Sequence, residues 1–380
     1  MSRKTWVALA LCGCFLASGL AAGEPVRIGG MAALQQGFGQ SIEAGARLAV
    51  HEINEAGGVL GNKIELTWLD SEHSPSTGRT LAQRLIFNDK VQAMMGCHSS
   101  SVVIAVEPMT KQNKILHLGM GSAPSLDEIS LKNPWLNRMR ENDLLTVEVV
   151  ANYAIDTLGL DKFACIYQSD QFGVGGRDSF KDVLKTRNLD VLASEAMNLQ
   201  DKDFTSQLLS VKQSGANALL LVCGVPALGM IAKQARQLIP DVTIFTTSVG
   251  AARPFYDVAL EASEGVYSVC TYIPTNPNPV VQKFNKDFEA LHKMPPQDFF
   301  AALGYDGIKT IAQAMIDAST TTDREKIRDA YRAIKDFPGA TGLKYQGSAD
   351  GNMIHELLMV IYRKDGAQEV VATVKGGGPK

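Results

Sequence analysis

The sequence has little excess charge, and this shortage excludes two classes of partner. The formal net charge is −3 over 380 residues, and the N-terminal segment that carries Arg3 and Lys4 contains no acid. The chain therefore lacks the basic face that nucleic acid or an anionic membrane surface requires, so we expect neither as a partner. Hydrophobic residues make up 45% and charged residues 20%, which is typical of a globular protein. The length suits two domains.

The motifs of common enzyme classes are also missing. Residues 173–177 lack the third glycine of a dinucleotide fingerprint, and His51-Glu52 has no second histidine four positions after the first. Neither a nucleophile elbow nor a phosphate-binding loop occurs. The histidines are scattered, and only His98 lies in a candidate site. We therefore expect no catalytic residue, no metal and no cofactor. An exported enzyme is the rival class, and these absences disfavour it.

Long apolar runs are confined to the N-terminus. Arg3 and Lys4 precede an apolar core at 6–16 and small residues at 17–23, which is the pattern of an export signal. We expect residues 1–23 to be removed and the protein to be periplasmic. The alternative is a lipoprotein anchor at Cys14, because residues 11–14 read Leu-Cys-Gly-Cys.

Cysteine is scarce in the rest of the chain. Beyond the export segment there are four: Cys97, Cys165, Cys223 and Cys270. The last three lie inside apolar runs, which favours buried free thiols. A disulfide is the open alternative in an oxidising compartment, and spacing alone cannot assign its partners.

What the chain does contain is a repeated alternation of strand and helix patterns. One series starts at residue 26 and a second near residue 142, and the turn-rich linker 274–279 is followed by three helices and two closing strands. Such alternation predicts an α/β fold with parallel sheets. We expect two Rossmann-like lobes, 24–141 with 274–345 and 142–273 with 346–380. Three connections would then join them as a hinge for closure on a ligand.

Two small-residue turns follow neighbouring strand patterns in the first series. Residues 96–101 read Gly-Cys-His-Ser-Ser-Ser and residues 119–124 read Gly-Met-Gly-Ser-Ala-Pro, each after a short apolar run. The first turn enters a helix through three serines. Free backbone N–H groups and hydroxyls there would suit a carboxylate. The alternative is that these serines only cap helices, but two such turns at one sheet edge favour a ligand crevice.

Several short segments carry a family resemblance. They are residues 44–46, 53–58, 61–63, 96–101, 122–124, 170–173, 202–204 and 304–306. In this order and spacing the chain resembles the periplasmic branched-chain amino-acid-binding proteins, which are type I solute-binding proteins of ABC transporters. The resemblance runs from about residue 26 to about residue 362.

The resemblance implies a set of ligand contacts. Ser99 and Ser122 match the hydroxyls that hold the ligand carboxylate. Met120 matches a position whose main-chain carbonyl accepts from the α-ammonium. Phe38 and Phe172 match aromatic residues on the first and second lobes, which are tyrosine in other family members.

The chain departs from the family on the ammonium side. Val249 stands where the family's acidic partner is expected, residues 242–256 contain no acid, and Val225 replaces an expected aromatic. A buried ammonium without a carboxylate would cost several kcal/mol. Asp170 could serve in principle, but its place just before Phe172 favours a helix cap.

We therefore expect the solute-binding component of an ABC uptake transporter of the branched-chain or hydrophobic amino-acid type. A small carboxylate-bearing solute would bind between the lobes. The departure at Val249 favours an alternative ligand without an amino group, such as an aromatic or aliphatic acid, which also suits Phe38, Phe172, Met120 and His98. A ligand-sensing receptor module is the other alternative. The expected partners are permease subunits at the membrane, and a monomer is expected.

Overall fold

The computed structural model describes residues 24–354 and 356–375. The predicted export signal at 1–23, with the possible lipid site at Cys14, lies outside the described residues. None of the helices in the described part of the chain combines the length and apolar character needed to cross a membrane. The four cysteines of this part are buried and free, as the sequence predicts.

The first sheet consists of five parallel strands in the order β2-β1-β3-β4-β5. Their bounds are β1 Val26–Ala32, β2 Ile64–Asp70, β3 Ala93–Gly96, β4 Leu116–Gly119 and β5 Leu136–Arg138. Central strands β1, β3 and β4 are almost wholly buried, because helices cover both faces of a parallel sheet.

The second sheet has seven strands in the order β14-β13-β10-β9-β8-β6-β7. Strands β6 to β10 run parallel, and the closing strands β13 and β14 pair antiparallel at one edge. Their bounds are β6 Phe163–Gln168, β7 Val191–Met197, β8 Ala218–Val222, β9 Thr243–Thr246, β10 Tyr267–Cys270, β13 Glu356–Tyr362 and β14 Gln368–Lys375. A small antiparallel pair, β11 Phe337–Pro338 and β12 Lys344–Tyr345, lies before them.

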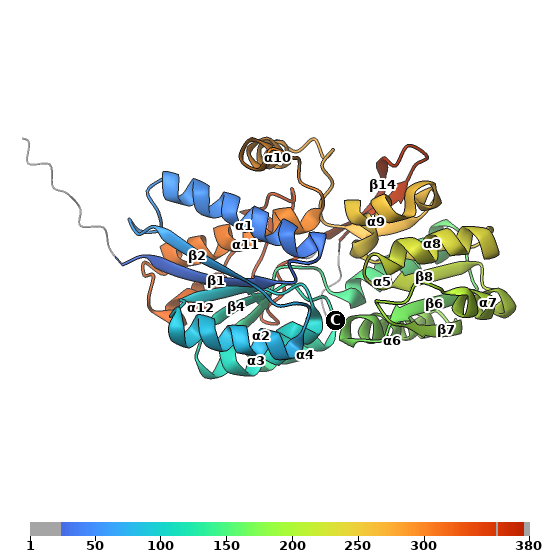
Figure 1. Ribbon diagram of the computed structural model, residues 1–380, viewed down its shortest axis with the longest axis horizontal. Helices are drawn as coiled ribbons and strands as arrows, with labels where there is room; N and C mark the ends of the chain where they lie inside the picture. Colours follow the sequence, from blue (N-terminus) through green and yellow to red (C-terminus); the bar gives the residue numbers. More distant parts are fainter. Residues whose placement is uncertain (1–23, 355, 376–380) are drawn as a thin grey trace, which may run out of the picture.

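Helices accompany both sheets (Figure 1). Those in the part of the chain that builds the first sheet are α1 Gly37–Glu55, α2 Pro75–Gln83, α3 Ser100–Gln112 and α4 Ser125–Lys132. Those in the second series are α5 Asp143–Asn152, α6 Gln171–Thr186, α7 Thr205–Ser214, α8 Ala227–Leu238 and α9 Arg253–Ala259. After the linker come α10 Pro279–His292, α11 Phe299–Asp317 and α12 Arg324–Arg332. Single π turns extend α2 (η1 Arg84–Asn88) and α5 (η2 Tyr153–Thr157), and 3-10 turns flank α9 (η3 Ser248–Ala251, η4 Leu260–Ser263).

The arrangement confirms the predicted α/β fold with a parallel-sheet core in each of two lobes. The described chain passes between the sheets three times: after β5, after β10 and after β12. The first and third connections run side by side, since Arg138 forms a bridge with Asn352 and its Nε donates to Asn352 Oδ1 at 2.8 Å. The residue boundaries given above for the lobes stay a prediction.

The helices after the linker return to the first lobe because α11 packs directly on α1. At the crossing a Cβ on Gly45 would overlap the carbonyl oxygen of Ala301, and one on Gly304 would overlap that of Ile42. The two backbones therefore touch, and only glycine permits the approach. This contact explains why 44–46 and 304–306 are among the recognised segments.

Replacing Gly45 tests this packing. We expect Gly45→Ala to lower the free energy of unfolding by about 1–3 kcal/mol, because the added methyl forces the two helices apart. The matched control is Gly37→Ala at the start of the same helix, where the nearest atom to a new Cβ is Pro254 Cγ at 3.5 Å. Urea unfolding of both variants measures the difference, and equal stability of the two would contradict direct backbone contact.

Candidate functional site

Each sheet has a point where the strand order reverses, and the two points face each other. In the first sheet β1 lies between β2 and β3, and in the second β6 lies between β7 and β8. Ligands of open α/β sheets bind at the carboxyl ends of strands beside such a point. A cavity of about 470 Å³, its opening to solvent included, lies there. We call it the inter-lobe cavity. Its lining residues are Gln36, Phe38, His73, His98, Ser99, Ser100, Arg140, Gln168, Asp170, Phe172, Leu199, Gly224, Val225, Val249 and Phe300.

Ser99 gives the first lobe an unpaired hydroxyl. It precedes α3 as the N-cap residue in an extended conformation, but its side chain makes no capping hydrogen bond. Its Oγ is buried and has no hydrogen-bond partner among the described residues. The first N–H groups of a helix lack intrahelical acceptors and carry partial positive charge. The N-terminal end of α3 is therefore suited to bind an anion. Next to it, the Ser100 hydroxyl is committed, since it accepts from Ala123 N at 3.1 Å.

Aromatic rings form a continuous wall beside Ser99. The ring centroids of Phe38 and Phe300 are 5.2 Å apart, and those of His98 and Phe300 are 5.9 Å apart. The Nε2 atom of His98 lies 2.9 Å from Gln36 Oε1. Burial lowers the pKa of His98 to about 3, and the charges of His73 and Arg140 act in the same direction. His98 is therefore a neutral part of the wall at pH 7, not a charge partner.

A buried guanidinium completes the first-lobe side. Arg140 is 3% exposed. Its Nε lies 3.1 Å from Glu141 Oε1, and its Nη2 donates to Ser248 Oγ at 2.7 Å. The guanidinium lies over the ring of Phe300, 5.1 Å from its centroid. Such a group binds carboxylates strongly where water is excluded.

The second-lobe side is apolar over most of its cavity surface. Phe172, Leu199, Val225 and Val249 supply that part, and Gln168 and Asp170 are its polar side chains. Asp170 is the only acid among the described residues that line the cavity. Its Oδ1 accepts from Gly173 N at 3.0 Å, which caps α6, and its Oδ2 accepts from the amide of Gln168 at 2.7 Å. Each oxygen of this acid therefore already accepts one hydrogen bond from within the second lobe.

A family model described as periplasmic binding protein matches residues 26–367. The chain belongs to the periplasmic binding protein family. This confirms the resemblance seen in the sequence, and the family is one of solute-binding proteins rather than enzymes. A curated relative, the Leu/Ile/Val-binding protein BraC3 of Rhizobium johnstonii, is 25% identical over 307 residues, 80% of this chain and 82% of its own length.

Solved structures agree with the fold of this periplasmic binding protein. The leucine-binding protein LivK of Thermotoga maritima has a TM-score of 0.84 and 25% identity, covering 92% of this chain and 99% of its own. A solute-binding protein of an R. palustris ABC transporter, solved in complex with benzoate, has a TM-score of 0.83. At 19% identity, over 93% of this chain and 97% of that one, the latter likeness shows the fold alone.

The sequence predicted eight ligand-contact residues for this binding protein, and six of them line the inter-lobe cavity: Phe38, His98, Ser99, Phe172, Val225 and Val249. Met120 and Ser122 do not. Met120 is fully buried, and the Ser122 hydroxyl donates to Asp143 Oδ2 at 2.9 Å. Burial raises the pKa of Asp143 to about 7, against the opposing charge of Arg140. The ligand roles given to all eight residues stay predictions.

Sequence reasoning missed four lining residues on the first lobe: Gln36, His73, Arg140 and Phe300. Arg140 lies two residues beyond the carboxyl end of β5, which ends at Arg138. A charged residue just beyond the carboxyl end of a parallel strand was the available signal. Phe300 belongs to a helix nearly 200 residues further along the chain, so no local pattern places it here.

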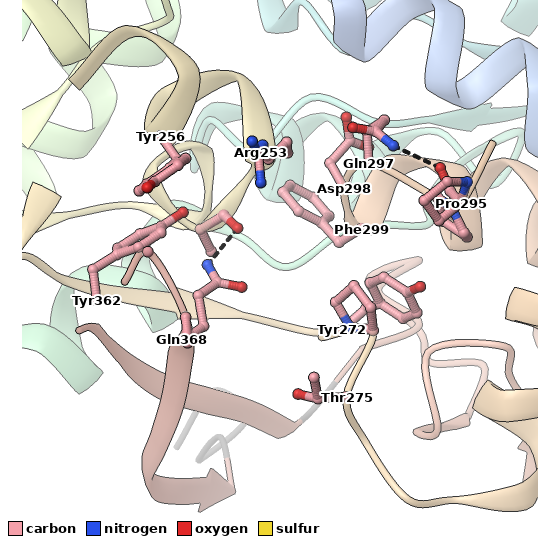
Figure 2. Close-up of a pocket in the computed structure, with 15 residues that line it drawn as sticks. Arg253, Tyr256, Tyr272, Thr275, Pro295, Gln297, Asp298, Phe299, Tyr362 and Gln368 are labelled. Carbon is pink, nitrogen blue, oxygen red and sulfur yellow. Dashed lines mark hydrogen bonds between the residues drawn. The ribbon is translucent and has the colours of Figure 1, made fainter. Parts of the chain in front are cut away.

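A larger hollow of about 1,050 Å³, its opening to solvent included, lies elsewhere, among α9, the linker after β10 and the start of α11 (Figure 2). Three of its polar side chains are bonded within the protein itself. Gln368 donates to the carbonyl of Ala251, and Asp298 accepts from Ser41 Oγ at 2.9 Å. Arg253 is paired with Asp257 at 2.7 Å.

The capping role of Asp170 is testable. We expect Asp170→Ala to lower the free energy of unfolding by about 1 kcal/mol, because α6 loses its N-cap acceptor, whereas Asp170→Ser keeps an acceptor and stays near the wild type. Urea unfolding monitored by circular dichroism measures both. An Asp170→Ala variant as stable as the wild type would show that the carboxylate is not needed as a cap and is free for another role.

Proposed function

We propose that this protein is the periplasmic solute-binding component of an ABC uptake transporter, and that its ligand is a small carboxylate with an aromatic or other apolar body. One observation carries the proposal. The inter-lobe cavity combines an unpaired buried hydroxyl at a helix N-terminus with a buried guanidinium and an aromatic wall, and it has no free acid. These groups complement an anion at one end and a ring along the wall.

An α-amino acid fits the same cavity less well. Its ammonium group would need a carboxylate or several acceptors once water is excluded, at a cost of several kcal/mol without them. Asp170 already accepts one hydrogen bond at each oxygen and caps α6, and Val249 offers only a hydrocarbon surface. The positive charge of Arg140 further disfavours a second cation nearby. The ligand named for the R. palustris structure, benzoate, is an acid of the proposed kind.

A branched-chain amino acid is the second candidate, because the curated relatives are named as Leu/Ile/Val-binding proteins. In both cases the ligand would be held between the lobes, which would close by bending at the three connections and present the closed form to a permease. The predicted export signal at residues 1–23 supports a periplasmic location.

Calorimetry with the full mature chain separates the two candidates. The panel is benzoate, phenylacetate and hexanoate beside leucine, isoleucine and valine. We expect at least one of the acids to bind with a lower dissociation constant than any of the three amino acids, because only they lack the ammonium group. Micromolar binding of leucine with no binding of the acids would contradict the proposed ligand class and leave the transport role intact.

Ser99→Ala tests the anion anchor. We expect binding of the preferred acid to weaken by about 1–3 kcal/mol, because a charged acceptor loses a donor. The free energy of unfolding should stay unchanged, since the Ser99 side chain makes no capping bond. Ser101→Ala, two residues along and outside the cavity lining, is the control. An unchanged dissociation constant in Ser99→Ala would show that the anion is held elsewhere.

A further inference from the structure

A histidine at the edge of the inter-lobe cavity has no partner for either ring nitrogen. Nδ1 and Nε2 of His73 are both buried, and neither has a hydrogen-bond partner among the described residues. The residue lines the cavity, and its ring lies beside that of His98 with 5.7 Å between the centroids. Buried polar atoms in folded proteins are almost always hydrogen-bonded. An imidazole with two unused nitrogens therefore points to a group that a ligand brings.

The imidazole is presented by a short turn fixed at both ends. Ser71 N donates to Ala32 O and Ser74 N donates to Ser71 O, each at 2.8 Å. The Ser74 side chain then caps α2. Glu72 and His73 have φ of 52° and 56°, the left-handed region that non-glycine residues adopt at an energetic cost. Such conformations persist where a site needs a side chain in one place.

The chemistry of His73 differs from that of the anion anchor. Burial lowers its pKa, with the charge of Asp170 partly opposing the shift, so the ring is neutral at pH 7. A neutral imidazole offers one N–H donor and one lone-pair acceptor. A carboxylate can only accept, and so can use the N–H alone, whereas a hydroxyl group can accept from the N–H or donate to the unprotonated nitrogen.

His73 and Arg140 contact different rings of the aromatic wall. His73 lies beside His98, at 5.7 Å between centroids, and Arg140 lies over Phe300, 5.1 Å from its centroid. The arrangement proposed here is a ligand ring on this wall with its carboxylate toward Ser99 and Arg140 and its far edge toward His73. Asp170 does not take up the imidazole, since its oxygens are bonded to Gly173 and Gln168.

We propose that His73 is a specificity-determining residue that hydrogen-bonds a hydroxyl group on the ligand, and that the preferred substrates are hydroxylated aromatic acids. This rests on the proposed function, in that it assumes an aromatic carboxylate in the inter-lobe cavity.

The first experiment needs no variant. The ligands for calorimetry of the full mature chain are benzoate and 3-hydroxy-, 4-hydroxy- and 4-methoxybenzoate. The hydroxyl group is both a donor and an acceptor, the methoxy group is an acceptor only, and benzoate has neither group on its ring. We expect one hydroxybenzoate to bind about tenfold or more tightly than benzoate, which corresponds to about 1.4 kcal/mol, and the methoxy compound to lose that gain. Equal affinity for benzoate and both hydroxybenzoates would overturn this inference and leave the proposed function standing. Binding of none of these benzoates would instead contradict the aromatic carboxylate that this inference takes from the proposed function.

The second experiment assigns the preference to His73. His73→Phe keeps a ring against His98 and removes both nitrogens, and His73→Gln returns one donor and one acceptor. We expect His73→Phe to bind benzoate within about threefold of the wild type and to lose the hydroxyl preference, and His73→Gln to restore part of it. His51→Phe, an exposed histidine on α1, is the control. A uniform loss of affinity for benzoate and hydroxybenzoates in a folded His73→Phe would overturn the assignment, as would a preference that survives it.

Discussion

The buried guanidinium of Arg140 is the interaction on which the site depends. A cation at this depth is costly unless its donors are used, and here the carboxylate of Glu141, the hydroxyl of Ser248 and two phenylalanine rings surround it. Ser248 comes from the second series of the chain and the two rings from α11. One residue therefore joins the lobes beside the cavity and sets its electrostatic character as favourable to anions.

The two lobes contribute different chemistry to the inter-lobe cavity. The first lobe lines it with the polar side chains of Ser99, His73 and Arg140, and the second lines it with Phe172 and mostly apolar side chains. The acid on the second lobe is used within its own structure to start α6. A ligand would thus be oriented by the first lobe and sealed from water by the second, which is an economical arrangement for a protein that closes on its ligand without chemical change.

Most of the fold was predictable because hydrophobic periodicity and glycine turns are local signals. The alternation of strands and helices and the turn before Ser99 follow from such patterns. Helices α4 and α9 have weak local signals, since they are short and begin beside a proline, Pro124 before α4 and Pro254 within the first turn of α9. So does the pair β11–β12, whose strands have two residues each.

The candidate site was predictable only in part, for a physical reason. Ser99, Phe38 and Phe172 stand at helix starts with recognisable neighbours. Arg140 and His73 lie in loops with no motif. Arg140 is notable because its partner is distant in the sequence, and His73 because its ring nitrogens have no partner. Arg140 meets Ser248 across 108 positions of the chain. The unpaired nitrogens of His73 are visible only when everything around them has been placed.

We propose that the inter-lobe cavity selects an organic anion without an ammonium group. The most direct measurement is to purify the protein from its own host without refolding, denature it, and identify the released small molecule by mass spectrometry. We expect a carboxylic acid that carries an aromatic or other apolar body and no amine. Release of leucine, isoleucine or valine in stoichiometric amount would contradict this proposal.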